Sequence, residues 1–133
     1  MTGISDIDIL LAAMRPALQP GEYVFCTVAE RDAELLPLSS LLATFREDEG
    51  MTLILERAAA DKAGLTYGPV MRCITLTVHS ALEAVGLTAA VAVALTRHGI
   101  SANVVAAYHH DHIFVPAQDA ERALVALAEA APV

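Results

Sequence analysis

The chain has 133 residues, of which 56% are hydrophobic, so it is long and apolar enough for one compact domain or for two small ones that share a core. Its formal net charge is −8 and its eight lysine and arginine residues are scattered singly, which argues against nucleic acid and anionic membrane as partners. No apolar run approaches the roughly 20 residues that span a bilayer, and the first residues lack the basic region of a signal peptide.

The first half of the sequence predicts alternating helices and strands. The expected elements are a helix over Asp6–Met14, a buried strand over Tyr23–Val28, an acidic turn at Glu47–Gly50, a strand over Met51–Leu55 and a helix over Arg57–Ala63 that Gly64 ends. The stretch Leu35–Ala43 is ambiguous because Pro37 interrupts it: it fits a short helix followed by a strand through Phe45.

The turn-forming residues Thr66–Pro69 predict a hinge, and a similar series of elements follows it. This series is a strand over Met71–Val78, a loop over His79–Gly86, a helix over Leu87–His98 that Gly99 ends, strands over Ile100–Ala107 and His112–Val115, and a helix over Ala120–Ala130 with Asp119 as its N-cap. We expect Val91, Ala94 and Leu95 to face the core from the first of these helices. From the second helix we expect Ala120, Leu124, Leu127 and Ala128 to face it.

The repeated order of elements indicates two copies of one small unit. We expect an N-terminal half over residues 1–66 and a C-terminal half over 67–133, with Tyr23–Val28 and Met71–Val78 in equivalent places. The fold class is α+β, with helices on one face of an antiparallel sheet. Cys26 and Cys73 lie in apolar, strand-like runs, which favours reduced core thiols and a cytoplasmic protein.

The run His109-His110-Asp111-His112 is the densest group of titratable side chains. On a regular strand His110 and His112 would share a face, as two metal ligands do, but nothing in the spacing specifies the remaining ligands. Catalysis lacks a recognisable activated nucleophile. The run also fits histidines that form a polar strand end or a subunit contact while Asp111 accepts hydrogen bonds from turn amides, or a group that faces a ligand. We therefore predict no metal site and no catalytic residue.

The second half resembles an ACT domain, a module that senses small molecules in amino-acid metabolism. The resemblance is carried by Ile74–Val78, Val85-Gly86-Leu87, Arg97–Ile100 and the pattern Asn103–Ala106, His110–His112 and Phe114–Pro116. The stretches Gly21–Cys26 and Glu49–Leu53 are similar to the first half of the same group of small bacterial proteins, which resemble tandem ACT units. The resemblance implies two ferredoxin-like βαββαβ-related units, and it extends over nearly the whole chain.

In ACT domains an effector usually sits where the first strand meets the first helix. Gly86 permits close approach of a ligand, and the start of the following helix favours a carboxylate. A ligand's ammonium group needs an acceptor, for which Glu83 and Asp111 are the candidates. The residues implied for ligand binding are Ser80, Glu83, Gly86, Leu87, Thr88, Ser101 and Asp111.

The resemblance thus implies a small regulatory or sensor protein that binds an amino acid or related metabolite. We expect a homo-oligomer, in the form of a dimer, because an open sheet face or edge can pair with a second unit. We expect neither catalytic activity nor a cofactor. Two alternatives stay open: a ligand-free dimerisation or interaction module, and a metal-dependent or acid–base enzyme that uses the cluster His110-Asp111-His112.

Overall fold

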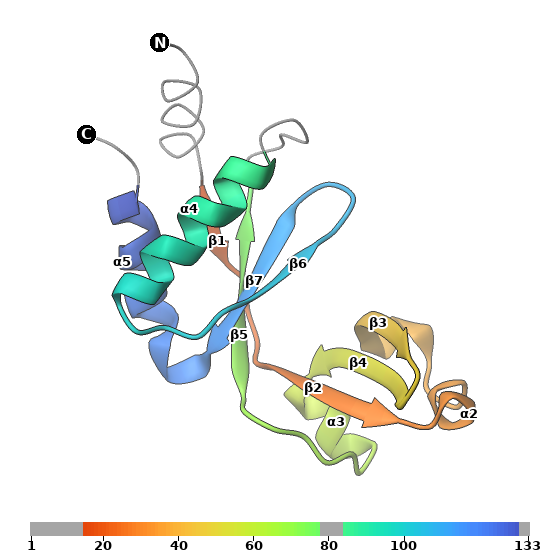
Figure 1. The fold of residues 1–133 in the computed structure, drawn as a ribbon. Coiled ribbons are helices and arrows are strands. Elements are labelled where there is room, and N and C mark those ends of the chain that lie inside the picture. The colour runs from red at the N-terminus through yellow and green to blue at the C-terminus, as the bar shows by residue number, and fades with distance from the viewer. Residues whose placement is uncertain (1–14, 78–83, 131–133) are drawn as a thin grey trace. The chain divides into compact units, whose positions relative to one another are not determined.

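The computed structural model describes residues 15–77 and 84–130, and the chain forms two compact units (Figure 1). One unit comprises Pro20–Met71, which we call the inserted unit. The other comprises Met1–Gln19 together with Arg72–Val133, which we call the discontinuous unit. Each unit has its own hydrophobic core, so each is described by itself.

The inserted unit is a three-stranded antiparallel sheet with short helices. Its elements are β2 (Tyr23–Val28), α2 (Glu30–Ala33), the 3-10 helix η1 (Leu38–Ser40), β3 (Leu41–Glu47), β4 (Gly50–Glu56) and α3 (Arg57–Lys62). The strand order is β3-β4-β2, and Leu53 of β4 pairs with Thr44 on one side and Cys26 on the other.

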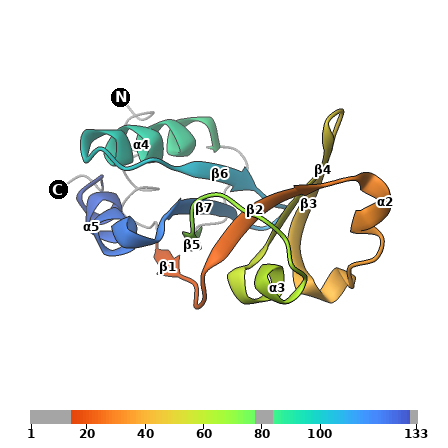
Figure 2. The same ribbon diagram turned by 90° about the horizontal axis from the view of Figure 1, so that it is seen from below.

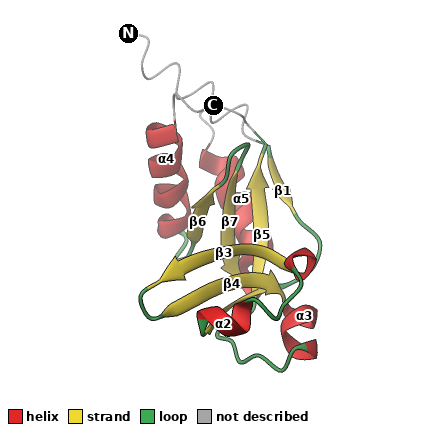
Figure 3. Ribbon diagram, turned by 90° about the vertical axis from the view of Figure 1, so that its right-hand side faces the viewer, coloured by secondary structure: helices red, strands yellow, loops and turns green. Residues whose placement is uncertain are grey.

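One face of this sheet forms the core of the inserted unit. Alternate residues of β2 and β4 point to that face and bury Val24, Cys26, Leu53 and Leu55 against Ala60 of α3. Ala33 and Leu36, from α2 and the segment after it, pack against the same cluster. Figure 3 shows α2 and α3 on the same side of β3 and β4.

The discontinuous unit has longer helices. Its elements are β1 (Pro16–Leu18), β5 (Met71–Leu76), α4 (Ala84–Arg97), β6 (Asn103–Ala106), β7 (Asp111–Pro116), the 3-10 helix η2 (Ala117–Asp119) and α5 (Ala120–Ala130). The strand order is β1-β5-β7-β6. β1 pairs antiparallel with β5, so a segment that precedes the inserted unit in sequence completes a sheet whose other strands follow it.

Both helices of the discontinuous unit cover one face of its sheet and contact each other (Figures 1 and 2). Ile74, Leu76, Ile113 and Val115 point to this face and are almost fully buried. From the helices, Val91, Leu95, Ala123, Ala126 and Leu127 pack against them. Val91, Ala94 and Leu95 are 1%, 6% and 1% exposed, which confirms the predicted inward face of α4.

The two units repeat one order of elements. In each, a strand is followed by a helical connection, a two-stranded hairpin and a helix, which are β2 to α3 in one unit and β5 to α5 in the other. This order confirms the predicted α+β class with tandem ferredoxin-like units. The predicted hinge at Thr66–Pro69 lies in the connection between α3 and β5. The division into halves at residues 66 and 67 stays a prediction.

Several predicted boundaries were wrong. α4 begins at Ala84, three residues before the predicted start, and β6 begins at Asn103 rather than at Ile100. In α5 the exposed Ala128 is not part of the inward face, where Ala123 and Ala126 lie instead. The small side chains of Ala123 and Ala126 are compatible with the contact between α4 and α5. The predicted helix Asp6–Met14 and most of the loop His79–Gly86 lie outside the described residues.

Candidate functional site

The start of β7 lies beside the end of β5, at the end of the discontinuous unit where α4 begins. A contact of 2.9 Å between Thr75 Oγ1 and His112 Nδ1 joins the two strands there. Figure 1 shows the first turn of α4 and the turn between β6 and β7 at this same end. Asp111, the first residue of β7, alternates with His112 and so lies on the face of Ile113, which α4 and α5 cover.

The predicted ligand-binding residues do not all gather at this end. Ser80 and Glu83 lie outside the described residues, whereas Gly86 and Leu87 lie in the first turn of α4. Thr88 is exposed and lies one turn inside the helix, where backbone N–H groups are engaged in helical hydrogen bonds. Its N–H is therefore not a free donor, and only its exposed side chain remains available to a ligand.

Ser101 lies at the opposite end of the hairpin from Asp111. Ala106 pairs with Asp111, whereas Asn103 pairs with Phe114, so the length of β6 separates Ser101 from the start of β7. Ser101 is exposed and follows the end of α4 at Arg97. Within this unit the structure does not bring Ser101 together with Asp111.

The histidine run is split between a turn and a strand. His109 is exposed in the turn, with its ring 4.9 Å from that of Tyr108, whereas His112 is partly buried on β7. Burial lowers the pKa of His112, the nearby His110 lowers it further, and the charge of Asp111 opposes both effects. Among residues 15–77 and 84–130, no three His, Cys, Asp or Glu side chains are arranged to hold a metal ion.

Two buried thiols lie in the strands, as predicted. Cys26 and Cys73 are both free, and burial raises the pKa of each thiol. A hydrogen bond from Thr75 opposes this effect at Cys73 without reversing it. Because the thiolate is the reactive form, neither cysteine has the character of a nucleophile.

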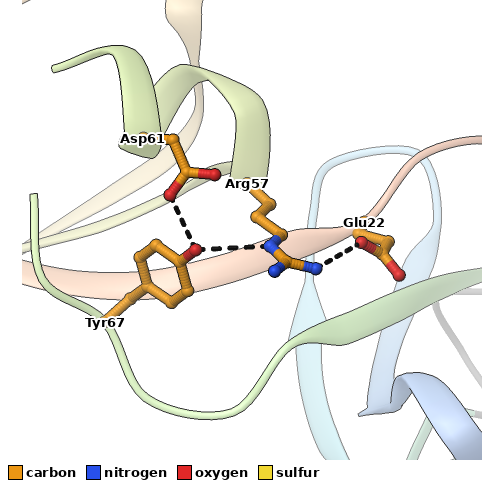
Figure 4. A network of polar contacts seen from close by, with 4 residues as sticks. All are labelled: Glu22, Arg57, Asp61 and Tyr67. Atoms are coloured by element: carbon orange, nitrogen blue, oxygen red, sulfur yellow. Dashed lines mark hydrogen bonds and ion pairs between the residues drawn. The ribbon is translucent and has the colours of Figure 1, made fainter. Parts of the chain in front are cut away.

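The inserted unit contains a network of polar contacts that was not predicted from the sequence (Figure 4). Arg57, the first residue of α3, donates to Glu22 at 3.1 Å and to the hydroxyl of Tyr67 at 3.3 Å. Tyr67 in turn donates to Asp61 at 2.7 Å. These bonds raise the pKa of the exposed Arg57, with the bond to Tyr67 as the larger cause. The network joins the residue before β2, the helix α3 and the loop that follows α3, all within the inserted unit.

The inserted unit also has an open groove, which we call the α2 groove. It lies between the α2–η1 segment and the strands β3 and β4, and its volume is about 270 Å³. Its apolar lining consists of Ala33, Leu36, Leu38, Leu41 and Met51. Glu30, Glu34 and Arg46 are its charged residues, and Arg46 donates to Glu30 at 2.8 Å.

Comparisons with known proteins agree with this architecture. A protein of unknown function from Vibrio cholerae, described as a possible transport protein, is 54% identical over 98% of this chain and 99% of its own, with a TM-score of 0.87. A protein from Agrobacterium tumefaciens is 20% identical over 89% of each chain, with a TM-score of 0.74. The regulatory subunit of aspartate kinase from Thermus thermophilus is 12% identical, covers 89% of this chain and 97% of its own, and has a TM-score of 0.67. The last two likenesses concern the fold alone.

Three further findings bear on the class of protein. A search of curated proteins found no match. Within the described residues, no helix combines the length and apolar character needed to cross a membrane. Two family models, both described as ACT domain, match residues 2–72 and 70–129. The chain therefore belongs to the ACT domain family, a family of regulatory modules that bind small molecules.

Proposed function

We propose that this protein is a small regulatory sensor that binds an amino acid or a related metabolite at the end of the discontinuous unit where α4 begins. Membership of the ACT family over both halves of the chain supports a regulatory role. The observation that carries the proposed site is the position of Asp111 beside the end of β5, because it places a carboxylate at the end of the unit where the first turn of α4 lies.

The chemistry of this end suits a zwitterion. The first turn of α4, which contains Gly86, offers backbone donors and the positive end of a helix dipole to a carboxylate. Asp111 supplies an acceptor for an ammonium group, and Glu83 is the second candidate acceptor. We further propose that Ser80, Leu87 and the hydroxyl of Thr88 contact the same ligand. We also propose a ligand contact for Ser101, which lies beyond the opposite end of β6 from Asp111.

A thermal-shift screen with the twenty amino acids and divalent metal ions tests the proposal. An amino acid that binds only the folded state raises the melting temperature, by an amount that grows with ligand concentration. Selective stabilisation by one or a few amino acids is expected. Stabilisation by zinc alone would favour the metal-dependent alternative. No stabilisation by any compound would favour the interaction module without a ligand.

Calorimetry on variants then locates the site. Gly86→Val should abolish binding by filling the space beside the first turn, and Asp111→Asn should weaken it by about 1–3 kcal/mol through loss of a charge-assisted hydrogen bond. Gly68→Val is the matched control, because a Cβ at Gly68 meets nothing within 4 Å. Asp48→Asn, in the exposed turn between β3 and β4, is the control for the lost charge. Unchanged affinity in both Gly86→Val and Asp111→Asn would exclude this end of the unit.

The sensor is further proposed to act as a homodimer in the cytoplasm. Both cysteines are buried and form no disulfide with each other, which suits a reducing compartment. Sedimentation equilibrium with and without the amino acid found in the screen measures the oligomeric state, and a monomer under both conditions would contradict the proposed dimer.

A further inference from the structure

The two units differ in how well helices cover the sheet. In the discontinuous unit, the connection from β5 to β6 holds α4, a helix of 14 residues that buries Val91 and Leu95 against the sheet. The corresponding connection of the inserted unit holds only α2, with four residues, and η1, with three. The α2 groove lies over this lightly covered part, where Leu41 and Met51 are only partly buried.

Large apolar side chains are exposed in the segment of the chain that contributes to this groove. Leu38, which lines it, and Leu35 are each 81% exposed, and Leu42 at the start of β3 is 52% exposed. Leu38 thus adds an exposed apolar side chain to the mostly apolar lining of the groove, and exposed apolar surface that polar groups surround marks interaction sites. The groove has a volume of about 270 Å³ and is lined mainly by apolar side chains, which suits the apolar side chains of a protein segment.

The charge of the inserted unit selects among protein partners. Residues 20–71 contain nine Asp and Glu against four Lys and Arg, so their net charge of −5 is the larger part of the total of −8. At the groove, Arg46 is already paired with Glu30, and Glu34 adds a further negative charge. A second copy that presents this same surface would bring like charges together here, whereas Lys and Arg side chains would complement the negative charge.

We propose that the α2 groove binds an amphipathic helix of another protein, with leucine-like side chains toward Leu38, Leu41 and Met51 and with lysine or arginine at its margins. The helix would cover the part of the sheet that α4 covers in the other unit, and this mode of binding uses apolar side chains at helical spacing. This surface is distinct from the proposed effector site, so the proposal goes beyond the sensor function and its test needs no effector.

Two model helices of 14 residues, the length of α4, provide the probes. Both carry leucine on one face, and the other face carries lysine in the first peptide and glutamate in the second. Fluorescence anisotropy with the full chain measures the affinity of each peptide. We expect the lysine peptide to bind at least about tenfold more tightly than the glutamate peptide, by an amount that falls with added salt.

Leu38→Glu tests the place of binding. It should weaken the affinity for the lysine peptide by about tenfold or more, because it puts a charged group into the apolar contact. The variant also adds a negative charge, so if charge alone drove binding, its affinity for the lysine peptide would increase instead. Val125→Glu is the matched control: Val125 is a 55% exposed residue of α5, and the change adds the same charge outside the groove.

Three results would overturn the proposal. They are equal binding of the two peptides, equal effects of Leu38→Glu and Val125→Glu, and a dimer of the free protein that Leu38→Glu dissociates. The last result would assign the groove to a second copy of the chain. Circular dichroism of both variants confirms that each remains folded, which is expected because both side chains are exposed.

Discussion

Replacement of Leu95 by alanine is expected to destabilise the discontinuous unit strongly. Leu95 is 1% exposed and belongs to the cluster that joins α4 to Ile113 on β7 and Leu127 on α5. The substitution removes three carbon atoms, and at about 0.8 kcal/mol for each buried methylene group the lost transfer energy is about 2.4 kcal/mol. A cavity that stays open adds to this loss, so the expected total lies between about 2 and 5 kcal/mol.

Urea denaturation followed by circular dichroism measures this loss as a decrease in the free energy of unfolding. Val93→Ala is the control, because Val93 lies on the same helix and is 50% exposed. The free energy of unfolding of Val93→Ala should differ from that of the parent chain by no more than about 0.5 kcal/mol. Surface substitutions rarely have a larger effect, and alanine has a higher helix propensity than valine. A loss below about 1 kcal/mol for Leu95→Ala, or equal losses for the two variants, would refute the assigned inward face of α4.

Two further outcomes are expected, one for pH and one for backbone conformation. The pKa of His112 is lowered in the folded state, so below about pH 6.5 the unfolded state binds more protons than the folded state and the free energy of unfolding decreases as the pH drops. The urea concentration at the midpoint of unfolding should therefore be lower at about pH 5.5 than at about pH 7.5. His112→Gln should reduce this difference. Gly50→Ala should lower the melting temperature more than Gly64→Ala does. Both glycines have positive φ angles, but a Cβ at Gly50 would lie 2.8 Å from the carbonyl oxygen of Val28, whereas a Cβ at Gly64 would meet nothing within 4 Å. Equal pH dependence in His112→Gln and the parent chain, or equal melting temperatures of the two glycine variants, would contradict these expectations.

Local signals in the sequence were sufficient for most strands. β2 and β4 match their predicted ranges to within one residue at each end, and α3 ends at Lys62, just before the turn at Gly64, as its C-terminal glycine indicates. The start of α4 was predicted three residues too late, because Gly86 suggested a loop. A glycine in the first turn of a helix costs little when the helix packs well further along, and the burial of Val91 and Leu95 supplies that packing.

The candidate sites depended more on tertiary structure. The spacing of His110 and His112 left open what faces them, and the contact of His112 with Thr75 involves a strand more than thirty positions earlier. The α2 groove had one local signal, Pro37, which rules out a long helix in the connection from β2 to β3. The meaning of Pro37 became clear only when the inserted unit was compared with the discontinuous unit, where the 14-residue helix α4 covers the corresponding face of the sheet.

The discontinuous unit places a constraint on the order of folding during synthesis. β1 leaves the ribosome before the inserted unit, but its partner β5 follows the inserted unit in the chain. The strands, helices and core of residues 20–71 are therefore all available before the pairing of Leu18 with Ile74 becomes possible. Until β5 has been synthesised, the backbone groups of Pro16–Leu18 lack their partner strand. During this stage of synthesis, pairing of these residues with a strand of another chain is most favoured.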